Sequence, residues 1–221
     1  MSLHLKHAPA TLADYLICDE KIGAVIRRYL NRTSMDPLLL YGPPGTGKTQ
    51  LAQLLPRAVI PSLAETPAGK IELNTGDTLF LRSNTLSGNQ LLKQLESFLS
   101  VTKLTNDEGA SVIIMDEVDT LGVAFLNDLK STLDHYMRAT TPLLVIMTTN
   151  YVGKIPLALQ SRCNCVEMGC IAPQDLVPLA MKVLIAEGKT YTPGQVHRVL
   201  SAGLTTSLDF REMHKRLALL L

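Results

Sequence analysis

Tryptophan is absent from the sequence, and aromatic residues make up only 5% of it. The core must therefore be mainly aliphatic, and a chain of 221 residues that is 46% hydrophobic is long enough to bury one. No apolar run approaches the roughly 18–20 residues that a membrane-spanning helix requires. The N-terminus also lacks the charged start, apolar segment and small-residue cleavage site of a secretory leader. We therefore expect a soluble, intracellular (cytoplasmic) chain with no membrane partner.

Charge of one sign is not in excess, because the formal net charge is only +1. A dedicated nucleic-acid binder usually has a basic face or a high pI, and this total gives no sign of either. It still leaves room for a local basic track, especially one assembled from several subunits.

Cysteine is scarce: the chain has four, at positions 18, 163, 165 and 170. Three of them lie close together in sequence, which raises the question of a metal site. Their Cys-x-Cys-x₄-Cys spacing lacks the paired arrangement of zinc ligands. We therefore expect reduced thiols, the usual state in a cytosolic chain.

Short apolar runs alternate with helical patterns through the first two-thirds of the chain. The runs at residues 38–41, 112–115 and 143–147 are nearly continuous, which is typical of strands buried on both faces of a parallel sheet. Helical patterns lie between and before them, at residues 19–31, 48–57, 88–101 and 123–138. This alternation predicts an α/β three-layer domain, which we place at residues 1–169.

The pattern changes after residue 168. Three helical stretches follow, at residues 173–187, 192–202 and 207–221, with no convincing strand among them. Prolines at positions 173 and 193 suit the first turn of a helix, and Thr192 can cap one. We therefore predict a small all-α domain at residues 170–221.

Residues 42–49 read GPPGTGKT and match the phosphate-loop pattern G-x-x-x-x-G-K-[ST] at every fixed position, between an expected strand and an expected helix. Glycines let successive backbone N–H groups curl around phosphate oxygens, and the following helix directs its positive end at the same point. In such a loop Lys48 bridges the β- and γ-phosphates and Thr49 holds Mg²⁺ through its hydroxyl. A tight Gly/Pro turn is the competing interpretation, which the strand–loop–helix context makes the weaker one. The predicted nucleotide-binding residues are Gly42, Pro43, Pro44, Gly45, Thr46, Gly47, Lys48 and Thr49.

Carboxylates follow the apolar run at residues 112–115. In open α/β sheets, ligands bind at the carboxyl ends of the strands. We expect Asp116 to hold Mg²⁺ through a water, and Glu117 to polarise the water that attacks the nucleotide. Asp119 receives no chemical role. A solvated acidic loop is the other interpretation, and the phosphate loop argues against it.

The next apolar run ends in Thr148, Thr149 and Asn150. An uncharged polar residue at this point can orient the attacking water or contact the γ-phosphate. It can equally open a turn before Gly153, and the local sequence favours neither interpretation.

In this order, the elements resemble those of the AAA+ ATPases and, more narrowly, the clamp-loader small subunits of the replication factor C type. Residues 156–163, PLALQSRC, are similar to the family's PLQSRC box, in which Arg162 would be the arginine finger. Asn150 falls on the sensor 1 position, and residues 208–211 resemble the sensor 2 turn, which would bring Arg211 beside the nucleotide. Weaker similarities lie at residues 9–16, 73–77 and 125–136.

The resemblance implies an AAA+ three-layer domain followed by a helical lid, with ATP and Mg²⁺ as its ligands. It implies catalytic roles for Glu117, Asn150, Arg162 and Arg211. It also implies a ring or spiral of AAA+ subunits that acts on a sliding clamp and on primer–template DNA. The candidate DNA contacts, for which a polar loop with a helix cap is the other interpretation, are Arg82, Asn84, Ser87 and Gln90.

The chain departs from the family pattern in two ways. The helical collar domain that follows the lid in clamp-loader small subunits is absent from this sequence, and the segment at residues 78–87 is longer than usual before its helix.

Two other functions fit the same motifs. One is an AAA+ remodeller of a protein target, which the fold cannot distinguish from a clamp loader. The other is a nucleotide-gated assembly module that binds ATP and hydrolyses it poorly. The presence of Lys48, Asp116 and Glu117 argues against this last function.

Overall fold

The computed structural model describes residues 2–60, 63, 77–82, 88–100, 110–137, 142–203 and 207–221. Residues 73–76, Asn84 and Ser87, which the sequence analysis singled out, lie outside this set. Among the helices that are described, none is both long and apolar enough to cross a membrane.

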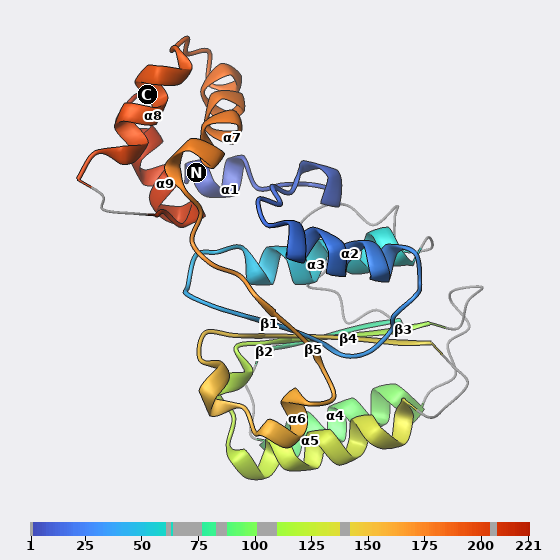
Figure 1. Cartoon of the computed structure of the whole chain (residues 1–221). Helices are drawn as coiled ribbons and strands as arrows, with labels where there is room; N and C mark the ends of the chain where they lie inside the picture. The colour runs from blue at the N-terminus through green and yellow to red at the C-terminus, as the bar shows by residue number, and fades with distance from the viewer. Residues whose placement is uncertain are drawn as a thin grey trace.

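A five-stranded parallel sheet forms the centre of the larger domain, with the strand order β2-β3-β4-β1-β5 (Figure 1). The strands are β1 Leu38–Tyr41, β2 Thr78–Arg82, β3 Ser111–Asp116, β4 Leu143–Thr149 and β5 Asn164–Glu167. β1, β3 and β4 confirm the three strands expected from apolar runs.

All four cysteines carry free thiols, and one of them, Cys165, lies in β5.

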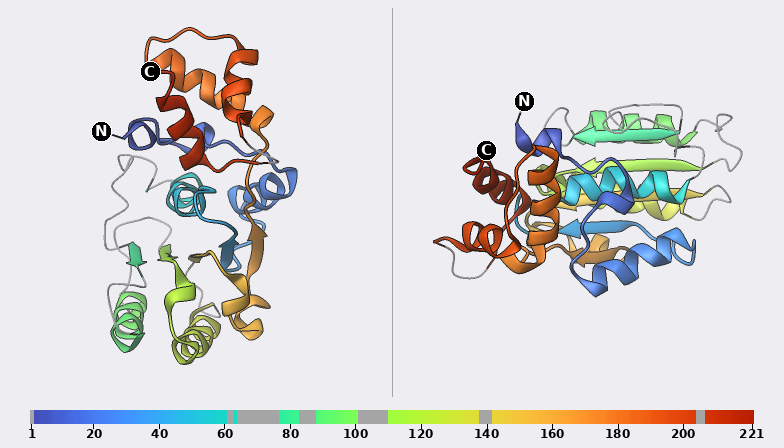
Figure 2. Two further views of the ribbon diagram at one scale, coloured as in Figure 1. Left: turned by 90° about the vertical axis from the view of Figure 1, so that its left-hand side faces the viewer. Right: turned by 90° about the horizontal axis from the view of Figure 1, so that it is seen from above.

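Helices cover both faces of this sheet, so the domain has three layers (Figure 2, left). α2 and α3 lie on one face, and α4, α5 and the short α6 lie on the other (Figure 1). Their bounds are α2 Glu20–Leu30, α3 Lys48–Val59, α4 Gly88–Ser100, α5 Val123–Tyr136 and α6 Leu157–Gln160. These helices confirm the expected α/β class.

Successive strand residues point to opposite faces of the sheet, which divides the core into two clusters. On β1, Leu38 and Leu40 pack in the cluster beneath α2 and α3, whereas Leu39 packs in the cluster of α4 and α5. All seven residues of β4 are buried. The apolar runs therefore reflect strands with hydrophobic neighbours on both sides.

A smaller helical domain, the lid, lies above the layer of α2 and α3 (Figure 1). It comprises α7 Pro173–Ala186, α8 Pro193–Ser201 and α9 Phe210–Ala218, and the N-terminal helix α1 Leu3–Lys6 packs on α9. Thr192 caps α8, as expected, by accepting a hydrogen bond from the backbone N–H of Gln195. A single antiparallel bridge, Ile171 to Leu208, joins the two segments that enter the lid.

The segment at residues 78–87, expected to be unusually long before its helix, begins with a strand that the sequence patterns did not predict. Residues 78–82 form β2, which pairs with β3 at the edge of the sheet. This strand offers only the short apolar run Leu79–Leu81 before Arg82, and a run of that length does not distinguish a strand from a loop.

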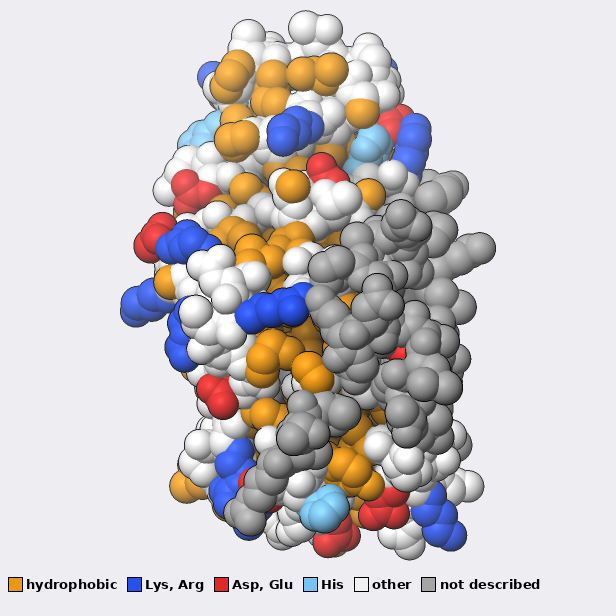
Figure 3. Space-filling view, turned by 90° about the vertical axis from the view of Figure 1, so that its right-hand side faces the viewer, with side chains coloured by type: hydrophobic (Ala, Val, Ile, Leu, Met, Phe, Trp, Pro, Cys, Tyr) orange, Lys and Arg blue, Asp and Glu red, His pale blue; other side chains and the backbone are white. Residues whose placement is uncertain are grey.

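Figure 3 shows the side of the molecule from which the strands enter the sheet. Apolar side chains gather across the middle of this face, and the Lys and Arg side chains drawn there are interspersed with Asp and Glu.

Candidate nucleotide-binding site

The phosphate loop connects β1 to α3 and needs glycine at its turns. Gly42 and Gly47 have φ values of 141° and 87°, in the region that favours glycine. A Cβ on Gly42 would also lie 2.2 Å from the carbonyl oxygen of Met168. Gly47 is the N-cap of α3 and offers no side chain to the first-turn N–H groups, so these can bind phosphate oxygens.

The side chain of Lys48 is held inside this loop. Its Nζ donates hydrogen bonds to the carbonyl oxygens of Gly42 and Pro43, at 2.8 and 2.7 Å. Burial lowers the pKa of Lys48, and the neighbouring carboxylate of Asp116 opposes that shift. A buried ammonium beside a ring of backbone N–H groups is suited to bind a polyphosphate.

Two hydroxyl side chains from different elements meet at one carboxylate. Thr49 and Thr148 both donate their hydroxyl hydrogens to Oδ1 of Asp116, at 2.7 and 2.6 Å. Mg²⁺ prefers oxygen ligands and keeps several waters, so Thr49 and Asp116 fit it. Across the described residues no group of three or more His, Cys, Asp or Glu could hold a metal ion.

Glu117 follows Asp116 in a strained backbone conformation. Its φ of 59° and ψ of 45° are left-handed, which is uncommon for a residue with a side chain. The hydroxyl of Thr148 accepts a hydrogen bond from the backbone N–H of Glu117, at 3.1 Å. Strain of this kind persists where the surrounding structure enforces it. The left-handed backbone of Glu117 sets the direction in which the chain leaves β3.

Asp119 ties this acidic segment to the end of β4. Its buried Oδ1 accepts hydrogen bonds from the hydroxyl of Thr149, at 2.8 Å, and from the backbone N–H of Asn150, at 3.1 Å. The structure therefore brings Asn150 beside the Asp116–Asp119 segment and gives Asp119 a role in holding it there.

The lid contacts the phosphate loop directly. The backbone N–H of Phe210 donates to the carbonyl oxygen of Gly45, at 3.1 Å, and a Cβ on Gly45 would lie 2.6 Å from the carboxyl carbon of Asp209. The next residue, Arg211, is exposed, and its charge is near enough to Lys48 to lower the pKa of Lys48, although less than burial does.

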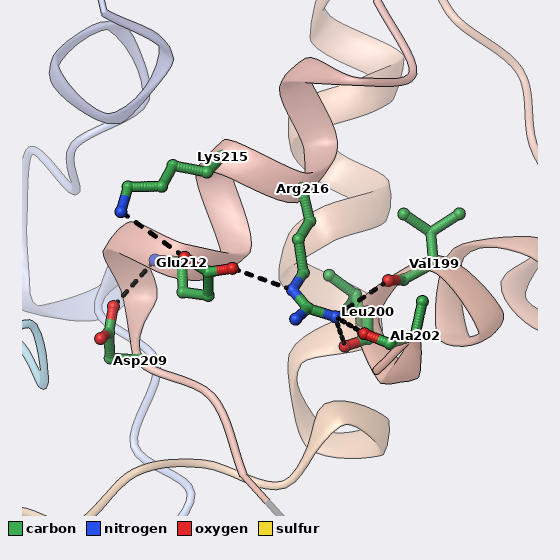
Figure 4. Close-up of polar contacts among 7 residues, drawn as sticks. All are labelled: Val199, Leu200, Ala202, Asp209, Glu212, Lys215 and Arg216. Atoms are coloured by element: carbon green, nitrogen blue, oxygen red, sulfur yellow. Dashed lines mark hydrogen bonds and ion pairs between the residues drawn. The ribbon is translucent and has the colours of Figure 1, made fainter. Parts of the chain in front are cut away.

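Hydrogen bonds within the lid fix α9 (Figure 4). Asp209 caps the helix by accepting a hydrogen bond from the backbone N–H of Glu212, at 2.8 Å. Arg216 donates through Nη1 to the carbonyl oxygens of Leu200 and Ala202 at the end of α8, at 2.9 and 2.6 Å. The helix that carries Arg211 is therefore held at both of its ends.

A cavity of about 350 Å³ lies between the N-terminal segment, the phosphate loop and the start of the lid. The Tyr15 hydroxyl donates to the carbonyl oxygen of Gly47, at 3.3 Å, which joins the N-terminal segment to the loop. The cavity is in the usual size range of small-molecule sites and suits a nucleoside. Residues that line it include Tyr15, Leu16, Ile17, Cys18, Thr46, Met168, Ile171 and Phe210.

Arg162 is bound to its own subunit on two sides. Its Nε donates to Oδ1 of Asp134 on α5, at 2.6 Å, and its Nη1 donates to the carbonyl oxygen of Ala158 on α6, at 2.7 Å. The hydrogen bond to Asp134 raises the pKa of Arg162 further above its usual range.

Arg162 and the phosphate loop lie at opposite ends of two neighbouring strands. β1 and β5 are parallel, with Leu38 beside Asn164 and Tyr41 beside Glu167. Arg162 comes just before β5 begins, whereas the phosphate loop comes just after β1 ends. At about 3.3 Å per residue, the strands alone separate these two points by roughly 10 Å. The structure therefore does not bring Arg162 to its own phosphate loop.

The candidate DNA contacts are only partly described. Arg82 ends β2 and is exposed, with its guanidinium carbon 5.6 Å from the centre of the Phe80 ring. Gln90 lies in the first turn of α4 and is also exposed. Asn84 and Ser87 lie outside the described residues, so the arrangement of the set stays a prediction.

Besides Asp119, two residues at this site have no role that the sequence assigns. The sequence places Thr148 in a polar strand end and Asp209 in a lid motif. A Thr-Thr-Asn end on a strand beside the acidic strand was a signal for Thr148, because neighbouring parallel strands end at the same edge of a sheet. Nothing in the local sequence indicated that Asp209 contacts Gly45.

Known proteins resemble this chain in both sequence and structure. It is 30% identical over 216 residues to mouse (Mus musculus) replication factor C subunit 5, covering 93% of this chain and 60% of that protein. It is 26% identical over 196 residues to the replication factor C small subunit of Methanococcus maripaludis, covering 88% of this chain and 58% of that protein. The chain thus spans about 60% of the length of the curated relatives it matches.

The solved structure of the Thermotoga maritima RuvB Holliday junction branch migration motor has the same fold. The TM-score is 0.65 at 16% identity, with 96% of this chain and 63% of that chain covered. Residues 38–168 match the family described as "ATPase family associated with various cellular activities (AAA)". This match extends from the first residue of β1 to just beyond β5, and so includes the phosphate loop and the acidic strand end. The chain belongs to the AAA family.

Proposed function

We propose that this chain is an ATP-hydrolysing subunit of a sliding-clamp loader that acts on primer–template DNA. The observation that carries the ATPase part is the convergence of Thr49 and Thr148 on one oxygen of Asp116, at the end of a phosphate loop that holds Lys48. The clamp-loading part rests on the similarity to replication factor C subunits, which covers 93% of the chain in mouse subunit 5.

In the proposed reaction, Lys48 and the loop N–H groups bind the β- and γ-phosphates. Thr49, and Asp116 through a water, would hold Mg²⁺, which would supply positive charge beside the phosphate oxygens. Glu117 takes up a proton of the attacking water as the water oxygen bonds to the γ-phosphorus. The bond between the γ-phosphorus and the bridging oxygen breaks, its electron pair stays on ADP, and ADP and phosphate leave. Asn150 orients the water or contacts the γ-phosphate, and Arg211 contacts the nucleotide from the lid.

We propose that Arg162 completes the site of a neighbouring AAA+ subunit. Its place at the end of the sheet opposite to its own phosphate loop supports action in trans. An arginine finger stabilises the charge that develops on the transferred phosphoryl group. A large apolar side chain is exposed nearby: Leu157, beside Ala158, is 80% exposed. An exposed apolar group beside a functional arginine suits a subunit contact.

The test measures ATP turnover of the chain, with its partner subunits where they are known, with and without primed DNA and at several salt concentrations. We expect primed DNA to raise turnover and the stimulation to fall steeply with salt, because Lys and Arg contacts with phosphates release counterions. Glu117→Gln, assayed under the same conditions, gives the background rate.

Stimulation by an unfolded protein, with none by DNA, would contradict clamp loading and support a protein remodeller. Absence of turnover above the Glu117→Gln background under every condition would contradict the ATPase assignment itself.

A further inference from the structure

Arg162 is held by an acidic side chain of the same subunit, Asp134, which the sequence motifs do not assign to the reaction. We infer that Asp134 is a positioning residue: it holds the guanidinium of Arg162 in the orientation in which its remaining N–H groups face the neighbouring subunit. This inference rests on the proposed role of Arg162 in trans.

The geometry of the guanidinium group supports this role. Arginine has five N–H donors in one plane, in a rigid fork. The Nε–H is directed to Asp134 and one Nη1–H to Ala158. Within the described part of the chain these are the hydrogen bonds of the Arg162 side chain, so three N–H groups remain for a phosphate oxygen. The side chain is 36% exposed, so a partner can reach it.

The two groups that hold Arg162 are themselves on fixed supports. Asp134 follows Leu133 on α5, and Ala158 precedes Leu159 on α6. Both leucines are buried in the same hydrophobic cluster, with 1% and 0% of their surface exposed.

The helix α6 is also tied to the turn that follows Asn150. Nε2 of Gln160 donates to the carbonyl oxygens of Val152 and Ile155, at 3.1 and 2.7 Å. Asp134 and Ala158, the two groups that hold the arginine, are therefore both attached to the buried core of the domain.

The ion pair is too exposed to act mainly on stability. The side chains of Arg162 and Asp134 are 36% and 34% exposed, and ion pairs in such positions contribute little to folding. Their effect is therefore on the orientation of the arginine. If the carboxylate instead withheld the arginine from the neighbouring subunit, removing it would raise the assembly-dependent kcat.

The experiment compares ATP turnover at high subunit concentration with turnover of the dilute chain, for Asp134→Ala and Asp134→Asn. We expect Asp134→Ala to lower the assembly-dependent kcat by about tenfold or more, the scale on which loss of positioning acts, with the Kd for ATP unchanged. Asp134→Asn should recover most of the rate, because its amide oxygen can still accept the Nε–H. Asp128→Ala, an exposed aspartate on the same helix, is the matched control.

A double variant locates the effect. Arg162→Ala/Asp134→Ala should be no slower than Arg162→Ala alone, because a positioning residue affects turnover through the arginine that it positions. In ¹⁵N NMR spectra, the Arg162 Nε–H signal should be protected from solvent exchange in the unaltered chain and lose that protection in Asp134→Ala.

A faster Asp134→Ala variant would overturn the inference, since Asp134 would then withhold the arginine. An unchanged assembly-dependent kcat in Asp134→Ala, together with an inactive Arg162→Ala, would overturn the role of Asp134 and leave the trans mechanism standing. An Arg162→Ala variant with the full assembly-dependent rate would overturn the proposed trans mechanism and, with it, the role of Asp134.

Discussion

The carboxyl group of Asp209, at the start of the lid helix α9, lies directly against Gly45 of the phosphate loop. A Cβ on Gly45 would come within 2.6 Å of the Asp209 carboxyl carbon, and Gly45 has a φ of 83°. The lid and the loop are therefore in contact at Gly45. A side chain at this position would strain the backbone and would also collide with Asp209.

The first prediction follows from this contact. Gly45→Ala should destabilise the chain by about 1–3 kcal/mol, because a left-handed backbone is costly for alanine, and it should weaken ATP binding. Thermal unfolding and calorimetric titration check the two effects. Adding Asp209→Ala should relieve the clash, but it leaves the backbone strain and removes the cap of α9, so recovery of stability relative to the Asp209→Ala single variant should be only partial. Full stability of Gly45→Ala would contradict the described contact.

Lys48 supplies the second prediction, because it is the only cationic side chain in the loop sequence GPPGTGKT. Lys48→Ala should reduce ATP affinity severely while leaving the fold intact, as circular dichroism would show. Calorimetry measures the affinity. Unchanged ATP binding would contradict the phosphate-loop assignment.

The third prediction separates binding from chemistry. Glu117→Gln keeps the size and hydrogen bonding of the side chain and removes the carboxylate that accepts a proton. ATP should bind as before, while turnover falls by about 10²-fold or more, the scale of general-base catalysis. Turnover close to that of the unaltered chain would mean that Glu117 is not the base.

A mixing experiment gives the fourth prediction. Arg162→Ala removes the finger and Lys48→Ala removes nucleotide binding, so each variant alone should be inactive. A mixed assembly contains interfaces in which an intact loop faces an intact finger, and its ATPase activity should recover. Mixed assemblies that form, as native mass spectrometry would show, but stay inactive would rule out action in trans.

The fifth prediction concerns pH and the contact between α1 and α9. Nδ1 of His214 hydrogen-bonds with the carbonyl oxygen of Phe210 at 2.7 Å, and its buried Nε2 has no hydrogen-bond partner among the described residues. Burial lowers the pKa of His214, and the neighbouring His4 and His7 lower it further, against the effect of the Phe210 hydrogen bond.

A histidine with a lowered pKa is neutral in the folded chain and takes up a proton more readily when unfolded. Its contribution to stability is therefore complete above the ordinary histidine pKa of about 6.5 and is lost as the pH falls through the lowered value. The Tm should decrease from pH 7.5 to pH 5.5, and His214→Phe should show a smaller decrease. An equal decrease in both chains would assign the effect to other groups.

The sequence was sufficient for those parts of the fold that depend on local patterns. β1, β3 and β4 are buried on both faces, so their residues form nearly continuous apolar runs. The backbone angles of the phosphate loop require glycine, so the loop has a recognisable glycine pattern. β2 was not recognised because an edge strand with three apolar residues, Leu79–Leu81, has no distinctive period. The four-residue helix α1 was missed for a similar reason, since a single turn has no periodic face.

The contacts that assemble the site depend on packing between distant segments, which the sequence does not encode locally. Asp134 reaches Arg162 across 28 residues of sequence, and Thr148 reaches Asp116 across 32. The motifs identified Arg162 and Asp116 because their types and spacing are characteristic. Their partners are an ordinary helical aspartate and a strand threonine, whose roles come only from the arrangement of α5, α6, β3 and β4.

The position of Arg162 and the phosphate loop at opposite ends of β5 and β1 has an arithmetic consequence for any assembly. With the proposed action of Arg162 in trans, each chain would contribute half of two different sites, so an open row of n subunits would contain n − 1 complete sites, whereas a closed ring would contain n. One terminal subunit of an open row keeps a loop without a finger, and the other keeps a finger without a loop. The ratio of hydrolysed to bound ATP in a single turnover therefore reports whether the row is open or closed.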